Sequence, residues 1–178
     1  MNANLTPLTW LDQVYGALFQ PQATFMQLRS QPVPVGAALV VALANLLESL
    51  RLGQDLPILL INLVAGLVGW FLLITILDRL VLIFSKSPEV NIPKLLTLTG
   101  FASTPWIFMA CVQTLENPWR LPLALVVGTW FGIWQIWATA IALAVSPWRL
   151  LTIIPLTLVG GLVGLVLLGN FFKLIFSV

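Results

Sequence analysis

Long, unbroken apolar runs dominate the pattern of hydrophobic and polar positions along the chain. A helix needs about 20 predominantly apolar residues to cross about 30 Å of hydrocarbon. Five segments reach or approach this length, at residues 34–52, 56–84, 95–115, 121–145 and 150–172. A membrane barrel strand would instead alternate apolar and polar residues over about ten positions. The pattern therefore predicts an all-α, polytopic membrane protein built as a bundle of five transmembrane helices.

The gaps between the five predicted spans are short and contain turn-forming residues. These residues are Gly53, Pro88, Pro118 and Pro147. Helices joined by short connections run antiparallel to their neighbours, so residues 34–178 are expected to form one transmembrane domain with no soluble domain inserted.

Residues 1–33 show a different pattern, in which apolar residues recur at helical spacing between polar ones. This pattern predicts an amphipathic helix that lies in the membrane interface. Pro21 breaks that helix and can open a second short one, in which Thr24, Phe25 and Leu28 form an apolar side. The segment is either an anchoring platform at the cytosolic surface or a docking surface for a partner. The candidate docking residues are Trp10, Leu11, Leu18 and Phe25.

The composition narrows the class of protein further. Of 178 residues, 60% are hydrophobic and 8% are charged, against about 25% charged in an ordinary soluble domain. Soluble enzymes, disordered proteins and nucleic-acid binders are thereby excluded. The chain has no histidine and one cysteine, Cys111, so the commonest general base, haem ligand and zinc ligand are absent. We expect no catalytic residue, no metal and no cofactor.

The distribution of basic residues predicts the orientation in the membrane. With five spans, the termini lie on opposite sides, and cytoplasmic loops carry the excess of Lys and Arg. The side of the N-terminus has Arg29, Arg79, Lys86, Lys94 and Arg149, whereas the other side has Arg51, Arg120 and Lys173. The count favours a cytoplasmic N-terminus and a C-terminus on the opposite side, without identifying the membrane.

Three polar residues share one face near the end of the first span. Asn45, Glu48 and Arg51 are three residues apart. Charged side chains inside a membrane are costly and often functional, so the three are a candidate intramembrane polar site that binds a proton or an ion. The alternative is an ion pair between Glu48 and Arg51 that snorkels to the interface and fixes the depth of the helix.

Pro105 lies inside the third predicted span. Proline removes one backbone hydrogen bond and kinks a helix, and the neighbouring Ser103 and Thr104 can bond the carbonyls that are freed. The candidate kink at Ser103, Thr104 and Pro105 either shapes a cavity or improves packing.

Small residues mark candidate helix contacts. Gly128 and Gly132 form a GxxxG pattern in the fourth span, and Gly160 and Gly164 form another in the fifth. In lipid this pattern lets helix backbones approach closely. It indicates packing within the bundle or a homodimer.

Tryptophans form a stripe on the fourth span, at Trp130, Trp134 and Trp137. A stripe of this kind either lines a hydrophobic or pigment-binding groove or faces lipid and the core of the bundle.

Two short motifs resemble those of the small bacterial Yip1-domain membrane proteins. Residues 20–28 are similar to a P-x-x-T-F-x-x-L motif, in which Pro21, Thr24, Phe25 and Leu28 match, and a glycine-led first span follows from Gly36. Residues 96–105 resemble an L-x-x-x-G-(Y/F)-A-x-x-P motif. The resemblance covers about residues 18–176 and implies five spans with a cytosolic N-terminus.

What the resemblance implies about function is limited. Yip1-type proteins of eukaryotes are implicated in vesicle trafficking and interact with Rab-type GTPases, partly through a longer cytosolic N-terminal region. Here the corresponding segment is residues 1–33, so GTPase binding is not carried over. The resemblance supplies no catalytic residue.

Three hypotheses about function remain. The leading one is a non-enzymatic scaffold or adaptor that organises membrane proteins or lipids, with the bilayer, other membrane proteins or a second copy as partners. The alternative is a small transporter or channel that uses the face of Asn45 and Glu48 and the kinked third span. An intramembrane enzyme comes third, because it requires a carboxylate pair, and Glu48 and Asp78 are expected on opposite sides of the bilayer.

Overall fold

The computed structural model describes residues 7–85 and 92–146, together with Trp148, Leu150, Leu151, Pro155 and Val159. Within these residues the chain is all-helical and contains no strand. Four segments are long and apolar enough to cross a membrane, at Pro34–Arg51, Leu56–Leu82, Ile92–Val112 and Arg120–Leu143. The chain therefore has the character of a polytopic membrane protein. Most of the fifth predicted span, residues 150–172, lies outside the described residues.

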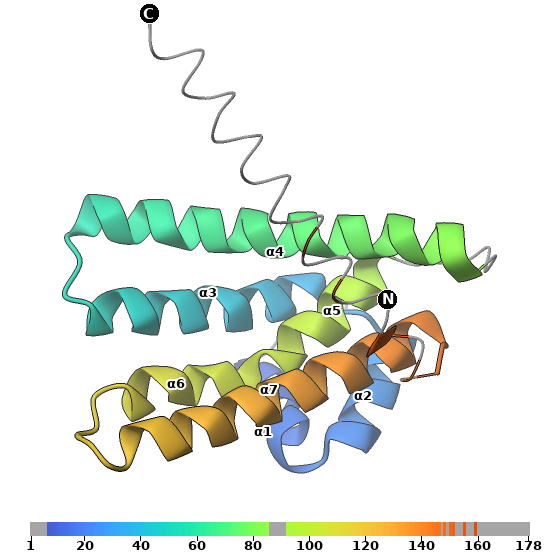
Figure 1. Ribbon diagram of the computed structural model, residues 1–178. Helices are drawn as coiled ribbons and strands as arrows, with labels where there is room; N and C mark the ends of the chain where they lie inside the picture. The colour runs from blue at the N-terminus through green and yellow to red at the C-terminus, as the bar shows by residue number, and fades with distance from the viewer. Residues whose placement is uncertain are drawn as a thin grey trace, which may run out of the picture.

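The four spans run alternately in opposite directions (Figure 1). Three of the spans are each formed by a single helix: α3 (Pro34–Arg51), α4 (Leu56–Ser85) and α7 (Arg120–Leu143). The third span is divided into α5 (Ile92–Ala102), the 3₁₀ turn η1 (Thr104–Trp106) and α6 (Ile107–Val112). The division falls at Pro105, which has no N–H to donate to the preceding turn.

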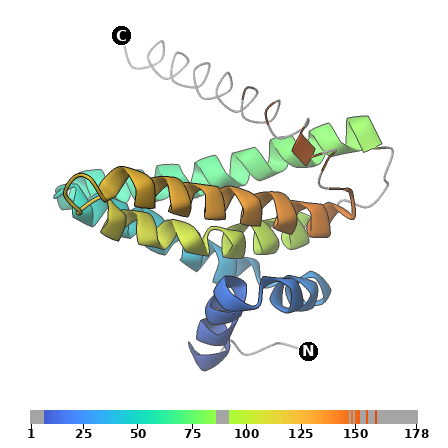
Figure 2. The same ribbon diagram turned by 60° about the horizontal axis from the view of Figure 1, so that its bottom comes forward.

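Two short helices precede the spans, α1 (Pro7–Phe19) and α2 (Pro21–Ser30). Pro21 stands at the first position of α2, where a missing N–H costs nothing. Both helices lie against the bundle on the side away from α4, as the two views show (Figures 1 and 2). They pack on α5, and α2 also packs on α7.

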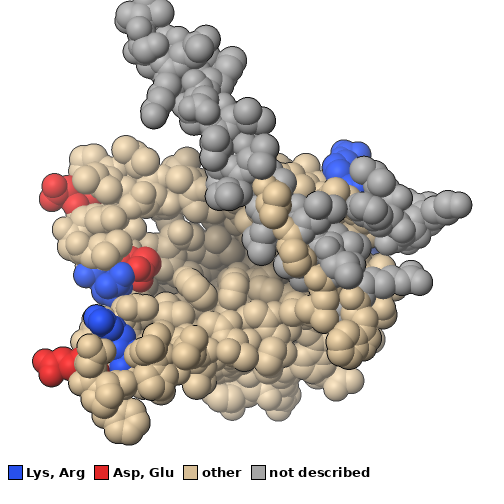
Figure 3. Space-filling view, viewed as in Figure 1, with Lys and Arg blue, Asp and Glu red and all other residues tan. Residues whose placement is uncertain are grey.

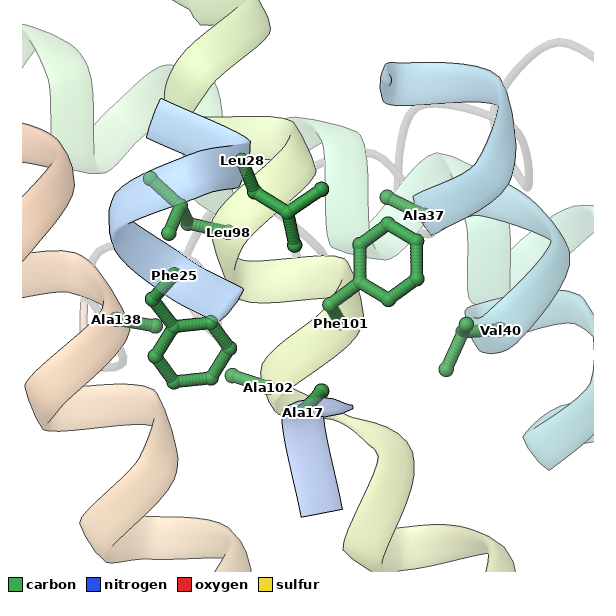
Figure 4. Packing of buried hydrophobic residues seen from close by; sticks show 9 residues of the cluster. All are labelled: Ala17, Phe25, Leu28, Ala37, Val40, Leu98, Phe101, Ala102 and Ala138. Carbon is green, nitrogen blue, oxygen red and sulfur yellow. The ribbon is translucent and has the colours of Figure 1, made fainter. Parts of the chain in front are cut away.

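The main hydrophobic core lies where α1 and α2 meet the spans (Figure 4). Phe25 and Leu28 of α2 pack there with Phe101 of α5, and Phe25 and Phe101 are fully buried. The other members of the core are Ala17, Ala37, Val40, Leu98, Ala102 and Ala138. Small residues keep the helices close: a Cβ placed on Gly100 would lie 2.6 Å from the Cβ of Ala37.

The charged side chains gather at the ends of the bundle. Figure 3 shows a cluster of acidic and basic groups at the end where α3 ends and α4 begins, with an uncharged surface along the helices. The residues in these helix ends and turns are Glu48, Arg51, Asp55, Glu116 and Arg120. The described parts of the spans thus present an apolar belt between polar ends, as a bilayer requires.

Candidate functional site

An open groove lies between α4 and α7 in the described part of the bundle. The helix α4 packs more extensively on α3 and α5 than on α7, and Figure 3 shows the surface hollowed beside α4. The groove has a volume of about 630 Å³ and is lined almost entirely by apolar atoms. Its lining includes Gly69 and Leu73 of α4, Val41 and Ala44 of α3, and Gly132 and Ile136 of α7. This apolar space at the depth of the spans is the candidate site.

A small hydrogen-bonded cluster lies on the floor of the groove. The Gln135 Nε2 atom donates to the Thr99 carbonyl oxygen at 3.0 Å and to the Ser103 Oγ atom at 2.9 Å. The Trp70 Nε1 atom donates to the Thr99 Oγ1 atom at 3.2 Å. These bonds join α4, α5 and α7, and all four residues line the groove. The cluster is therefore the polar part of an otherwise apolar site.

The break at Pro105 creates this cluster. The Ser103 N–H bonds the Gly100 carbonyl in 3₁₀ fashion, so the Thr99 carbonyl accepts from the Ser103 hydroxyl at 3.0 Å and from Gln135 instead. Proline has no N–H for the Phe101 carbonyl, and the Thr104 hydroxyl donates to that carbonyl at 2.6 Å. Ser103 and Thr104 thus bond the carbonyls that the break frees.

The three polar residues of the first span separate into two groups. Asn45 lines the groove, where its Nδ2 atom donates to the Val41 carbonyl at 2.8 Å and its amide packs on Gly66. Glu48 and Arg51 do not line the groove. They form an ion pair in the last turn of α3, with the Arg51 Nε atom 2.9 Å from the Glu48 Oε2 atom. This geometry matches the interfacial ion pair rather than a joint ion-binding site.

The predicted docking residues of the N-terminal segment do not form one exposed surface, so the prediction is wrong for Phe25. The Phe25 side chain is fully buried in the core, and the Trp10 Nε1 atom donates to the Gly36 carbonyl at 3.0 Å. Leu11 is 55% exposed, and Leu18 is half-buried. The apolar side of α2 faces the chain's own bundle. Burial there removes these side chains from water as effectively as a partner or lipid would.

The tryptophan stripe also serves packing. The Trp134 Nε1 atom donates to the Ala17 carbonyl, which caps the end of α1, at 2.7 Å. The Trp134 ring meets those of Trp130 and Trp137 edge-on, with centroids 5.9 and 6.0 Å apart. None of the three lines the groove, and Trp134 fastens α1 to α7.

The glycines of the fourth span face open space in the described part of the molecule. No described atom lies within 4 Å of a Cβ placed on Gly128 or Gly132. Close helix contacts are made at other glycines, such as Gly66 against Asn45 and Gly100 against Ala37. The expectation that Gly128 and Gly132 pack on another helix is therefore not met among these residues, and Gly160 and Gly164 lie outside them.

The acidic residues and the cysteine are dispersed. Among the described residues, no group of three His, Cys, Asp or Glu side chains could hold a metal ion. Asp78 is buried near the far end of α4, with its Oδ2 atom 3.9 Å from the Arg79 Nε atom. Its Oδ1 atom has no hydrogen-bond partner among the described residues. Glu48 lies at the other end of the bundle, and Cys111 is exposed. Glu48 and Asp78 therefore do not form a carboxylate pair.

Gln135, Thr99 and Trp70 are the hydrogen-bonding residues of the groove cluster that the sequence did not predict. A signal existed for one of them, because Gln135 is the one carboxamide within residues 121–145, and polar residues inside a span tend to face the bundle. Against known proteins, the chain matches no protein-family model, no curated protein and no solved structure.

Proposed function

We propose that this protein is a non-enzymatic scaffold or adaptor of the membrane, with five spans, that organises membrane proteins or lipids. The observation that carries the proposal is the helix α1, which packs on α2 and α5 on one side and exposes apolar residues on the other. Leu11, Tyr15 and Phe19 are 55, 61 and 63% exposed. Successive members are four residues apart, so they share one face of α1.

The fixed side makes this face a rigid platform. Hydrogen bonds from Trp10 to Gly36 and from Trp134 to Ala17 hold α1 at two points, and Phe25 holds α2 in the core. On the free side, the rings of Tyr15 and Phe19 pack together with centroids 4.7 Å apart. Exposed apolar and aromatic residues on a pre-organised support are typical of binding surfaces. We propose that this face enters the bilayer interface and binds membrane partners there.

The distribution of charge supports a cytoplasmic N-terminus and an opposite C-terminus. Arg29, Arg79 and Lys94 lie at the end of the bundle where α3 begins, and Arg51 and Arg120 at the other. A majority of basic residues at the first end is what the positive-inside rule associates with the cytoplasm.

The resemblance to Yip1-domain proteins is part of the proposal. It is supported by the way the two motifs meet, because Phe25 and Leu28 of the first pack with Phe101 and Ala102 of the second. Both motifs thus serve one core, which gives a physical reason for their occurring together. GTPase binding is not proposed.

The proposal is tested by replacing the platform residues and identifying what remains bound. The triple variant L11S/Y15S/F19S removes the apolar face without touching the core. It should keep the wild-type melting temperature in mild detergent and lose the proteins or lipids that co-purify with the wild type, as identified by mass spectrometry. The matched control is L125S on α7, where Leu125 is 62% exposed. Identical bound material in all three proteins would contradict the proposal.

The groove favours one second candidate, a small transporter or channel. Asn45 and Ser103 line it together with Gln135, which gives a path beside the break in the third span. If the protein is a transporter or channel, the N45L variant should still assemble in proteoliposomes but should show a lower flux of a solute or ion. A scaffold shows no flux above that of empty vesicles, with or without N45L.

A further inference from the structure

The two helices that border the groove leave most of their surface uncovered in the described part of the chain. Only 11% of the spanning window is buried in α4 and in α7, against 50% in the third span. Helices in a membrane associate through close packing and through hydrogen bonds between polar groups. The groove between α4 and α7 has both features, with the open Gly132 on one wall and the Gln135 cluster on its floor.

The chain continues from one end of this groove. Leu150, the first residue of the fifth predicted span, is fully buried. It packs in one cluster with Ile74 and Leu77, which line the groove, and with Leu143 at the end of α7. The start of the remaining apolar segment is therefore held against the wall of the groove.

The remaining segment has the length and composition of an occupant. Residues 150–172 contain no Asp, Glu, Lys or Arg, and Arg149 and Lys173 flank them. As a helix the segment extends about 35 Å at about 1.5 Å per residue, which is enough to run back along the 24 residues of α7. The short connection after Leu143 requires the two to be antiparallel neighbours if both cross the membrane.

The small residues of the two segments fall at matching depths. Counted from Leu143 backwards, Gly132 and Gly128 lie about 16 and 22 Å along α7. Counted from Leu150 forwards, Gly160 and Gly164 lie about 15 and 21 Å along a helix. Gly128 and Gly132 have open space beside them, so two GxxxG patterns at equal depth let the backbones approach closely.

The polar residues match in the same register. Gln135 lies about 12 Å from Leu143 along α7, and Thr157 about 10 Å from Leu150 along a helix. Both Nε2 hydrogens of Gln135 are used by Thr99 and Ser103, and the Oε1 atom of a carboxamide is an acceptor with two lone pairs. A threonine hydroxyl can donate to that oxygen.

We propose that the groove between α4 and α7 is the docking site of the chain's own residues 150–172, which fill it as the fifth span. Gly160 and Gly164 pack on Gly132 and Gly128, and Thr157 bonds Gln135. The groove is then an internal interface of the bundle. The proposal does not rest on the scaffold function, because α1 and α2 take no part in the groove.

Cysteine cross-linking in native membranes tests this placement. In a C111S background, the groove residue Leu73 is changed to cysteine, and residues 156–167 are changed to cysteine one at a time. Oxidation should give intramolecular disulfides at positions three or four residues apart, identified by mass spectrometry of the linked peptides. The matched control is F71C, because Phe71 is on α4 two residues away, is 49% exposed and does not line the groove. It should give no intramolecular links.

Three outcomes would overturn the proposal. Links from L73C that join two chains would assign the groove to a second copy. A complete absence of links from L73C would leave the groove to lipid or solute. Equal linking from F71C and L73C would show that the segment has no defined place.

A second variant tests the glycine contact separately. G132W fills the groove at the proposed crossing and should reduce the yield of L73C links severalfold, whereas I133W on the exposed side of α7 should leave the yield unchanged. Exposure of Ile133 is 51%. Unchanged linking in G132W would exclude the contact between Gly132 and residues 150–172. If G132W does not accumulate in the membrane, G132V serves as the smaller change with the same expected direction.

Discussion

The third span has two sides that differ in how they are used. On the side of α1, α2 and α3, its residues Leu98, Phe101 and Ala102 are fully buried, and Gly100 brings its backbone against Ala37. On the side of α4 and α7, its residues Thr99 and Ser103 face a groove of about 630 Å³. The first side is packed by described residues, whereas the second is an open apolar groove in the described part of the chain. The packed core of the described bundle therefore lies on one side of the third span, and the open apolar space lies on the other.

The largest loss of stability is expected on the packed side, when the Phe25 side chain is truncated. Replacing it by alanine removes a fully buried ring from the core and should lower the free energy of unfolding by about 3 to 5 kcal/mol. The measurement is denaturant unfolding in detergent micelles. The control F19A removes a ring that is 63% exposed and should change the free energy by less than about 0.5 kcal/mol. Similar effects of the two changes would show that α2 is not part of the core.

The same residue shows where sequence reasoning stops. Thr24, Phe25 and Leu28 are visible in the sequence as an apolar side, and in the structure these three are the buried residues of α2. The pattern indicates that this side avoids water, but lipid, a partner and the chain's own bundle are equally apolar. Which of the three it meets depends on tertiary contacts with Phe101 and Ala138, and the helical period contains no information about them.

The spans themselves were more accessible to prediction. Apolar length alone placed the helices at 34–52 and 121–145, close to the observed Pro34–Arg51 and Arg120–Leu143. The chemistry of Pro105 indicated a break in the third span, where the structure has η1. The groove cluster was not predicted, because Gln135 bonds Thr99 and Ser103 at separations of 36 and 32 residues. Such pairs leave no local spacing to recognise.

Gly100 on the packed side and Gly69 in the groove lining differ in the space available to a larger side chain. In G100A the added Cβ meets the Ala37 Cβ at 2.6 Å and the Ala37 carbonyl oxygen at 3.0 Å, so α3 and α5 must separate. Overpacking of this kind costs about 1 to 3 kcal/mol of unfolding free energy. In G69A the added Cβ enters open space in the groove lining, with no described atom within 4 Å. The melting temperature in micelles should fall clearly in G100A and much less in G69A. The reverse order would place the close contact on the groove side.

On the groove side, loss of the Gln135 carboxamide should lower the unfolding free energy by a moderate amount. Q135L removes the donor to Thr99 and Ser103, but the Thr99 carbonyl keeps its bond from the Ser103 hydroxyl at 3.0 Å. The expected loss is therefore about 1 kcal/mol, in the range of one interhelical hydrogen bond in a membrane. Thermal unfolding in micelles measures it, with Q113L at the end of α6 as the control for loss of a carboxamide. A loss as large as that in F25A would mean that the cluster holds the helices together as strongly as the core does.

The smallest effect is expected from the ion pair at the end of α3, which belongs to neither side of the third span. The Glu48 and Arg51 side chains are 39 and 23% exposed, and an exposed pair three residues apart contributes about 0 to 1 kcal/mol. E48Q should therefore lower the unfolding free energy by less than about 1 kcal/mol, and R51Q should add little to it in the double variant. Because Glu48 does not line the groove, E48Q should also leave the cross-linking of Leu73 to residues 156–167 unchanged. A change in the yield of these links would show that the ion pair at the end of α3 influences the groove, and the two regions would then not be independent.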